Sequence, residues 1–145
     1  MAERSNLAHN IFRLHNAVVK ERNRVLSDND LTSTQADVIV FISEYDGAEE
    51  INQLDIQQAF HLTNPTISGL IDRLEEKGFV KRVRSAYDAR YRKIELCEKS
   101  TAILEKLISN AEQIEDELLS GLSETEKSEF IIYFKKVLET AEEKN

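Results

Sequence analysis

The chain has 145 residues, of which 27 are acidic and 19 are basic, so its formal net charge is −8. That length suits one domain, and 41% hydrophobic residues with only four glycines and one proline favour a mostly helical globule. The sequence contains no nucleophile elbow, glycine-rich phosphate loop or clustered metal ligands, which argues against an enzyme and against a bound metal or cofactor. The single cysteine, Cys97, excludes an internal disulfide and fits a small half-buried residue better than a redox switch, because no second cysteine could resolve it.

No apolar run of about 18 residues is present, and the N-terminal sequence MAERSNLAHN lacks the apolar stretch of a signal peptide. We therefore expect a soluble, cytoplasmic protein without a membrane partner. The charge is uneven along the chain: residues 77–99 hold eight basic and three acidic side chains, whereas the rest is acidic. One basic segment in an acidic protein concentrates positive potential locally, which is compatible with a phosphate contact of limited area.

A long first helix is predicted over residues 6–26, where apolar residues recur at spacings of three and four, close to a heptad pattern: Leu7, Ile11, Leu14, Val18 and Val25. Such a stripe packs either on a distant helix of the same chain or on another subunit. His9 and His15 lie on this helix, but six residues apart they do not share the face that metal chelation from one helix requires. We therefore expect polar or partly buried histidines.

Two short helices follow, each opened by a predicted capping box, in which a side chain and the backbone satisfy each other's free N–H groups: Thr32 with Gln35, and Asn52 with Asp55. The apolar run at 38–42 indicates that the first of them is largely buried, and this helix is expected to end at Asp46–Gly47. Between the two helices, Glu50–Ile51 is a candidate short strand.

The stretch Thr63–Gly78 is predicted to be a helix with well marked ends. Thr63 or Asn64 can cap its N-terminus, and Pro65 has the φ of a first helical position. Gly78 can adopt the left-handed conformation that ends a helix. Four apolar residues share one stripe, which we expect to be buried: Ile67, Leu70, Ile71 and Leu74. The outward residues are mostly small and polar, with one arginine a turn further on: Asn64, Thr66, Ser68, Gly69, Asp72 and Arg73.

Such a polar face suits the groove of a nucleic acid, and two short helices joined by a turn form a helix-turn-helix. The runs 79–83 and 93–97 are β-prone, and the segment between them, RSAYDARYR at 84–92, is basic. A basic hairpin after a helix-turn-helix predicts a winged helix, in which the helix occupies the major groove and the wing reaches an adjacent minor groove. The alternatives are a core helix with an idle polar face and a winged helix that binds protein instead of DNA.

Three stretches in order, LTSTQADVIVFI, LTNPTISGLIDRLEEKGFVKR and DARYRKIEL, resemble the MarR family of bacterial and archaeal winged-helix regulators. The family pattern has a recognition helix ending in D-R-L-E-x-x-G-[LFYW]-[VI]-x-R and a wing with D-x-R. This chain carries both motifs: Asp72–Arg73–Leu74–Glu75, Gly78–Phe79–Val80, Arg82, and Asp88–Ala89–Arg90. It departs from the family at His61, which replaces a frequent turn glycine, and after the second strand, where Cys97 and Ser100 stand. Neither departure lies at an expected DNA contact.

The predicted interface with double-stranded DNA has three sets of residues. Base-edge readers are expected near the start of the recognition helix: Asn64, Thr66 and Ser68. Phosphate contacts are expected from a hydroxyl and three arginines: Thr63, Arg73, Arg84 and Arg92. Arg90 is predicted to enter the minor groove, with Asp88 holding its guanidinium in one pose. The alternative for this last pair is a surface ion pair of little energetic value.

Residues 99–120 and 123–142 have the apolar periodicity of two helices, and Ser123 with Glu126 forms a third capping box. The winged core, about 30–98, is too small to cover these helices and the helix at 6–26. We therefore predict a mainly α fold with a small β-wing, a winged helix-turn-helix flanked by N- and C-terminal dimerisation helices (about 6–26 and 99–142). The chain would form one domain over 1–145 and a homodimer, as the resemblance also implies.

The resemblance further implies a transcriptional regulator, by expectation a repressor, that binds a pseudo-palindromic operator. It also implies a cleft between the dimer helices and the winged domain for a small effector, aromatic or anionic. Five residues are candidates for lining such a cleft, and each is equally compatible with an ordinary core position: His9, Phe12, His15, Phe41 and Tyr45.

Overall fold

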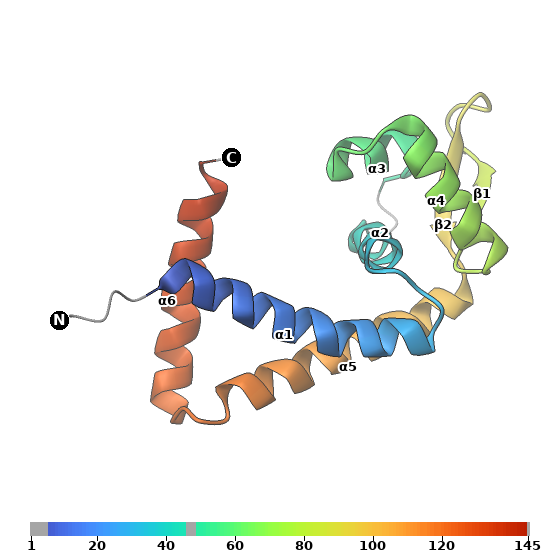
Figure 1. Ribbon diagram of the computed structural model, residues 1–145. Coiled ribbons are helices and arrows are strands. Elements are labelled where there is room, and N and C mark those ends of the chain that lie inside the picture. Colours follow the sequence, from blue (N-terminus) through green and yellow to red (C-terminus); the bar gives the residue numbers. More distant parts are fainter. Residues whose placement is uncertain (1–5, 46–48, 145) are drawn as a thin grey trace. The chain divides into compact units, whose positions relative to one another are not determined.

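The computed structural model describes residues 6–45 and 49–144 (Figure 1). In chain order the elements are α1 (Leu7–Asp28), α2 (Ser33–Glu44), α3 (Gln53–Phe60), α4 (Asn64–Glu76), β1 (Val80–Arg84), β2 (Arg92–Leu96), α5 (Glu98–Leu119) and α6 (Glu124–Glu142). The chain divides into two compact units, residues 1–110 and 111–145, and α5 is continuous across the division. The predicted end of the second helix at Asp46–Gly47 lies outside the described residues.

The core of the first unit lies between α2, α3, α4 and the β1–β2 hairpin, with the start of α5 completing it (Figure 1). Three of the four stripe residues of α4 are fully buried, as predicted, and Leu70 is partly buried against the core. The largest fully buried side chains are branched or aromatic: Phe79, Leu26, Ile39, Ile56, Ile67, Ile71 and Leu74. Because α4 buries this stripe, its opposite face is fixed in an outward direction.

The three predicted capping boxes are confirmed, each with both reciprocal hydrogen bonds: Thr32 with Gln35, Asn52 with Asp55, and Ser123 with Glu126. Between α3 and α4 the chain turns through His61, whose φ is 51°. This left-handed backbone is the conformation that a glycine adopts without a steric cost from Cβ. The substitution of the family's frequent turn glycine therefore falls at a position where glycine is the less strained residue.

The start of α4 differs from the prediction. Thr63 is the N-cap residue, but its side chain makes no capping hydrogen bond, and its hydroxyl instead lies 2.8 Å from the hydroxyl of Thr66. Asn64 is already helical, so Pro65 occupies the second helical position and not the first. At the other end Gly78 has a φ of 79°, the left-handed conformation that was predicted for it.

The hairpin is antiparallel, with Val80 opposite Leu96 and Arg84 opposite Arg92. Both strands begin and end one residue away from the predicted limits. The candidate strand at Glu50–Ile51 is wrong, because this segment makes a single ladder-like hydrogen bond, from the Ile94 N–H to the Ile51 carbonyl at 2.7 Å. Among the described residues the sheet has two strands.

Helix α1 runs two residues beyond its predicted end and contacts the winged core only near that end, where Leu26 is buried. Arg22 joins α1 to α2 through an ion pair with Asp37 and a hydrogen bond of 2.9 Å to Ser33. Towards its N-terminus α1 exposes apolar side chains: Leu7, Ile11, Phe12 and Leu14. The predicted stripe is therefore largely uncovered within the chain.

Helix α5 contributes to the core of the first unit through Ile103, which is only 2% exposed, and in part through Leu104 and Leu107. The expectation that the winged core leaves the helix at 99–120 uncovered is therefore wrong for the first part of this helix. Ser100 is also buried, and its hydroxyl donates to the Phe79 carbonyl. Cys97 is half-buried, as expected, and its N–H donates to the same carbonyl.

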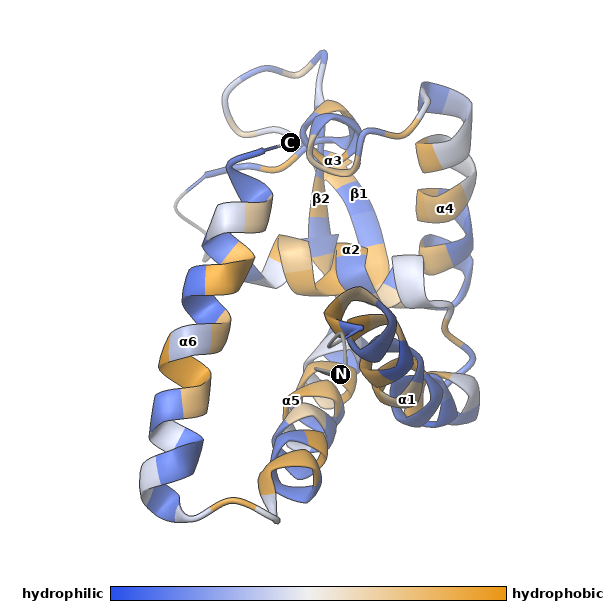
Figure 2. Cartoon of the chain, turned by 60° about the vertical axis from the view of Figure 1, so that its left-hand side comes forward, coloured by the Kyte–Doolittle hydropathy of each residue, from blue (hydrophilic) through white to orange (hydrophobic). Residues whose placement is uncertain are grey.

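In the second unit, α6 has no buried residue, and hydrophobic residues are distributed along its length (Figure 2). Six of its large apolar side chains are more than 40% exposed: Phe130, Ile132, Tyr133, Phe134, Val137 and Leu138. None of the helices in the described part of the chain is long and apolar enough to cross a membrane.

Candidate nucleic-acid interface

The exposed face of α4 carries the polar residues that the sequence predicted for it. Asn64, Thr66 and Arg73 are exposed, and Ser68 is half-buried one turn into the helix. Ile67 and Ile71 hold the opposite side of the helix in the core. Short polar side chains near a helix N-terminus, presented on a fixed scaffold, are the arrangement that reads base edges in a major groove.

Asn64 is held in place by a neighbouring helix, which the sequence did not predict. The side-chain amide of Gln53, the first residue of α3, donates to Asn64 Oδ1 at 2.9 Å. The side-chain oxygen of Gln53, Oε1, in turn accepts from the Arg82 guanidinium on β1 at 3.4 Å. The amide group of Asn64 is therefore oriented before any ligand arrives, which lowers the entropy cost of a contact through its NH₂ group.

Arg82 ties β1 to α4. Its guanidinium lies 2.8 Å from Asp72 Oδ1 and 3.7 Å from Glu75 Oε2, and its backbone N–H donates to the same Glu75 oxygen at 2.9 Å. The Arg82 side chain is only 18% exposed. Asp72 and Glu75 of the predicted recognition-helix motif therefore bind Arg82 and attach the hairpin to α4. Arg82 is not available to a phosphate.

Within the wing, Arg90 and Asp88 form the pair that the sequence predicted. The guanidinium donates twice, from Nε to Oδ1 at 3.2 Å and from Nη2 to Oδ2 at 3.1 Å, and the Arg90 N–H also donates to Oδ1 at 3.0 Å. These hydrogen bonds, the side-chain one first, lower the pKa of Asp88. The Arg90 side chain is 86% exposed, so a bidentate carboxylate fixes an arginine that otherwise points into solvent.

At the base of the wing, Arg84 and Arg92 lie directly opposite each other on β1 and β2, and both are exposed. Like charges at facing positions of an antiparallel pair destabilise the hairpin, and a bound anion would relieve the repulsion. Neither arginine forms an ion pair within the described part of the chain, and the same holds for Arg73 on α4.

The other cations of the basic segment 77–99 are engaged inside the protein. Lys77 donates to the Asp30 carbonyl at 2.6 Å and to Gln35 at 3.2 Å. Lys93 pairs with Glu95 at 2.6 Å, and Lys99 donates to the Lys77 carbonyl while lying 4.4 Å from the centre of the Phe79 ring. The net positive charge of this segment is therefore larger than the charge that is available for contacts with phosphates. Among the described residues of α4 and the wing, the cations without an ion pair, here called uncommitted, are Arg73, Arg84 and Arg92.

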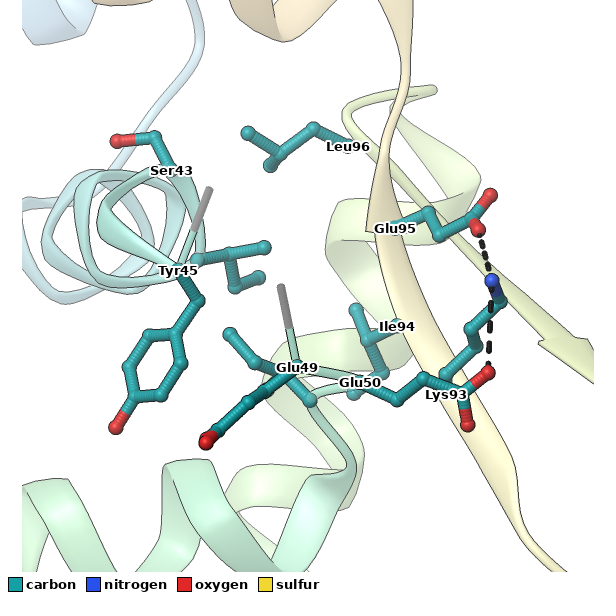
Figure 3. Close-up of a pocket in the computed structure, with 10 residues that line it drawn as sticks. Ser43, Tyr45, Glu49, Glu50, Lys93, Ile94, Glu95 and Leu96 are labelled. Atoms are coloured by element: carbon teal, nitrogen blue, oxygen red, sulfur yellow. Dashed lines mark ion pairs between the residues drawn. The ribbon is translucent and has the colours of Figure 1, made fainter. Parts of the chain in front are cut away.

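The aromatic residues considered for an effector cleft do not gather in one place. The Phe41 ring centre lies 5.0 Å from that of Tyr45, in a tilted arrangement, and 5.6 Å from that of Phe60, edge to face, whereas Phe12 is near His15 on α1 and 63% exposed. A pocket of about 370 Å³ lies between the end of α2 and β2, with Tyr45 at its edge (Figure 3). Its charged lining residues are three carboxylates and one ammonium group, which disfavours an anionic ligand: Glu49, Glu50, Glu95 and Lys93.

In the described residues no group of three or more histidine, cysteine, aspartate or glutamate side chains could hold a metal ion. A helix-turn-helix followed by a two-stranded antiparallel wing defines the class of winged helix-turn-helix proteins. The family model of the MarR family matches residues 29–90, which include α2, α3, α4 and β1. Over this segment the chain is similar to the MarR family.

The similarity to solved structures extends beyond the winged region. The S. aureus MepR–DNA complex superimposes with a TM-score of 0.75 at 27% identity, covering 92% of this chain and 98% of that one. A point mutant of S. aureus MepR gives a TM-score of 0.80 at 25% identity, covering 92% and 97%.

Among curated proteins, the HTH-type transcriptional regulator PecS of Dickeya dadantii (strain 3937) is 26% identical over 105 residues, or 72% of this chain. The matched segment spans 63% of the length of PecS.

Proposed function

We propose that this protein is a regulator of transcription that binds double-stranded DNA in a sequence-specific manner. The observation that carries the proposal is the polar face of α4, with Asn64 oriented by α3, beside a wing whose Arg90 is fixed by Asp88. The similarity to MepR, which has been solved bound to DNA, supports it. The similarity to the MarR family likewise supports a regulator and not an enzyme.

The protein binds DNA as a homodimer in this proposal. The exposed apolar side chains of α1 and α6 form surfaces that a monomer in water would leave uncovered, and a second copy of the chain is the simplest cover. A twofold dimer places two α4 helices in successive major grooves. The operator should then be pseudo-palindromic, with half-sites about one helical turn apart.

Within each half-site we assign roles by side-chain chemistry. Asn64, Thr66 and Ser68 read base edges, because they carry short hydrogen-bonding groups on the outer face of α4. Phosphates are contacted by Thr63 and by the three uncommitted arginines: Arg73, Arg84 and Arg92. Arg90 enters the minor groove, where a narrow A·T-rich sequence concentrates negative potential.

Repression and control by a small effector are the finer parts of the proposal. A ligand that prefers one spacing of the two α4 helices shifts the DNA-binding population by its differential affinity for the two states. Screening aromatic compounds, both phenolic anions and cations, for loss of operator binding tests this point. An affinity that no compound changes would favour control by the abundance of the protein alone.

Duplex binding over a range of salt concentrations tests the central proposal. Three uncommitted arginines per protomer give six in a dimer, so log affinity should fall with log salt with a slope of about −5. No duplex binding at low salt would instead favour a winged helix that binds protein. A much steeper slope would show that cations paired inside the protein are released to contact phosphates.

A further inference from the structure

Glu50, in the connection between α2 and α3, holds the wing. One carboxylate oxygen accepts from the Ser85 hydroxyl, and the other accepts from the Ala86 N–H at 2.9 Å. Ser85 and Ala86 are the first two residues after β1, where the wing loop begins. A residue 35 positions away in the sequence therefore fixes the entry to this loop.

The contact continues from Ser85 towards the tip of the wing. The Ser85 hydroxyl oxygen accepts from the N–H groups of Tyr87 at 3.1 Å and Asp88 at 3.2 Å. Asp88 then holds the guanidinium of Arg90. An unbroken series of hydrogen bonds thus joins Glu50 to the arginine that is expected to reach DNA, since a hydroxyl that donates to a carboxylate has its lone pairs free to accept.

A second set of contacts joins residues 50–51 to the second strand of the wing. The Ile51 carbonyl accepts from the Ile94 N–H on β2, and the Ile51 side chain is buried. Lys93, on the same strand, lies 3.7 Å from Glu50 and 2.6 Å from Glu95, so its ammonium group bridges the two carboxylates (Figure 3). Residues 50–51 therefore contact the hairpin at both its loop and its second strand.

The ionised form of Glu50 is the form that this arrangement favours. Its pKa is lowered, first by the hydrogen bond from Ser85 and then by that from the Ala86 N–H, with Lys93 adding to the effect. A carboxylate that accepts two hydrogen bonds and faces an ammonium group stays charged at neutral pH. Its negative charge is therefore retained next to a surface that should attract phosphates.

We propose that Glu50 is a positioning residue for DNA binding, which sets the wing relative to α4 and so places Arg90 at the minor groove. The proposal rests on the proposed function. Charge counting gives the opposite expectation, because removing a carboxylate near the interface should tighten binding to a polyanion. The sign of the effect therefore separates positioning from simple electrostatics.

Glu49 provides a matched control. It is the adjacent glutamate, it is exposed, and none of the hydrogen bonds or ion pairs of the described residues involves its side chain. Glu49→Ala and Glu50→Ala remove the same charge from neighbouring positions. Glu50→Gln keeps one carbonyl oxygen that can accept from the wing, so it should lie between wild type and Glu50→Ala.

The experiment measures affinity at one salt concentration for a duplex selected from a random pool by the wild-type protein. We expect Glu50→Ala to weaken binding by about ten-fold, because the wing must then be ordered on binding, and Glu49→Ala to leave the affinity unchanged or slightly higher. Ser85→Ala should weaken binding too. Combined with Glu50→Ala it should add little, because the two residues act in one series of contacts.

Amide hydrogen exchange in the free protein gives a readout that does not depend on DNA. The N–H groups of Ala86, Tyr87 and Asp88 should exchange faster in Glu50→Ala than in Glu49→Ala. Exchange in the buried turns of α4, around Ile71, should stay as in wild type, which shows that the fold is intact.

Two results would overturn the role of Glu50: binding by Glu50→Ala as tight as that by Glu49→Ala, or wing amides that exchange no faster. Failure of the wild-type protein to select any duplex is a different outcome. It would overturn the proposed function, and with it the role of Glu50 in DNA binding, whereas the exchange comparison would still show whether Glu50 holds the wing.

Discussion

Helices α4 and α6 carry similar apolar residues at similar spacings but differ in what covers them. In α4, Ile67, Ile71 and Leu74 are fully buried by other elements of the first unit. In α6 no residue is buried, and Phe134 and Leu138 are each more than 40% exposed. Amphipathic periodicity therefore shows that a face will be covered, but it does not show whether the cover comes from the same chain.

Because the apolar face of α4 is covered within the chain and that of α6 is not, substitutions in the two helices should have different effects. The winged region has its own core, so substitutions there should act on folding irrespective of protein concentration. The apolar side chains of α6 gain from burial only when another surface arrives, so substitutions there should act on association. The following variants test this division, beginning with the largest expected effect.

Leu74→Ala should lower the free energy of unfolding by about 2–5 kcal/mol, because it leaves a cavity in the core between α4 and its neighbours. The matched change on α6, Leu138→Ala, should cost less than about 1 kcal/mol in dilute protein, where the side chain is exposed. Urea unfolding followed by circular dichroism at two protein concentrations measures both. Equal losses at the two positions would contradict the comparison.

Phe134→Glu should weaken self-association by about 100-fold, because a charge would be buried where an aromatic ring is expected to pack against a second copy. Sedimentation velocity over a dilution series gives the dissociation constant. Lys135→Glu, at the next position along α6, is the control for a new negative charge on this helix. A wild-type protein that stays a folded monomer at micromolar concentration would refute the dimer.

Arg73→Ala should weaken binding to all duplexes alike, by about ten-fold, and should reduce the salt slope by about two in a dimer, because each protomer loses one phosphate contact. Ser68→Ala should instead relax the sequence preference, since it removes a base-edge contact. Neither variant should change the mass of the oligomer. A changed preferred sequence in Arg73→Ala, with non-specific binding spared, would contradict this assignment.

The smallest expected effect concerns the wing pair. Arg90→Ala loses its contact with the minor groove, and Asp88→Ala should also weaken binding, by about five-fold, by releasing the Arg90 guanidinium. Removal of a negative charge alone would predict tighter binding by Asp88→Ala. Operator affinities of both variants at one salt concentration decide between the two, and tighter binding by Asp88→Ala would exclude an orienting role.

Much of the fold could be predicted because the signals are local. A capping box such as Thr32 with Gln35 lies within four residues, and the stripe of α4 repeats within two turns. The candidate strand at Glu50–Ile51 is wrong because propensity does not show how many hydrogen bonds a segment makes, and the single one from Ile94 does not form a ladder. The expectation that the helix at 99–120 has no cover in the same chain is wrong at Ile103, because the residues that bury it come from elements far away in the sequence.

At the candidate site, contacts between residues close in the sequence could be predicted, whereas contacts between elements could not. Asp88 and Arg90 are two residues apart, so their pairing could be inferred from spacing, and the structure confirms it. The support of Asn64 by Gln53, across 11 residues, and the contact of Glu50 with Ser85 depend on how the elements pack. No pattern in the sequence distinguishes these two residues from ordinary surface polar residues.

The small number of uncommitted cations has a consequence for how the protein would find its site in a genome. Affinity for arbitrary DNA depends on phosphate neutralisation, and most lysines and arginines of the basic segment already have internal partners. An acidic protein whose described α4 and wing offer Arg73, Arg84 and Arg92 as uncommitted positive charges should dwell only briefly on non-cognate DNA. Its search should then proceed by repeated dissociation and three-dimensional diffusion, with short sliding distances along the duplex.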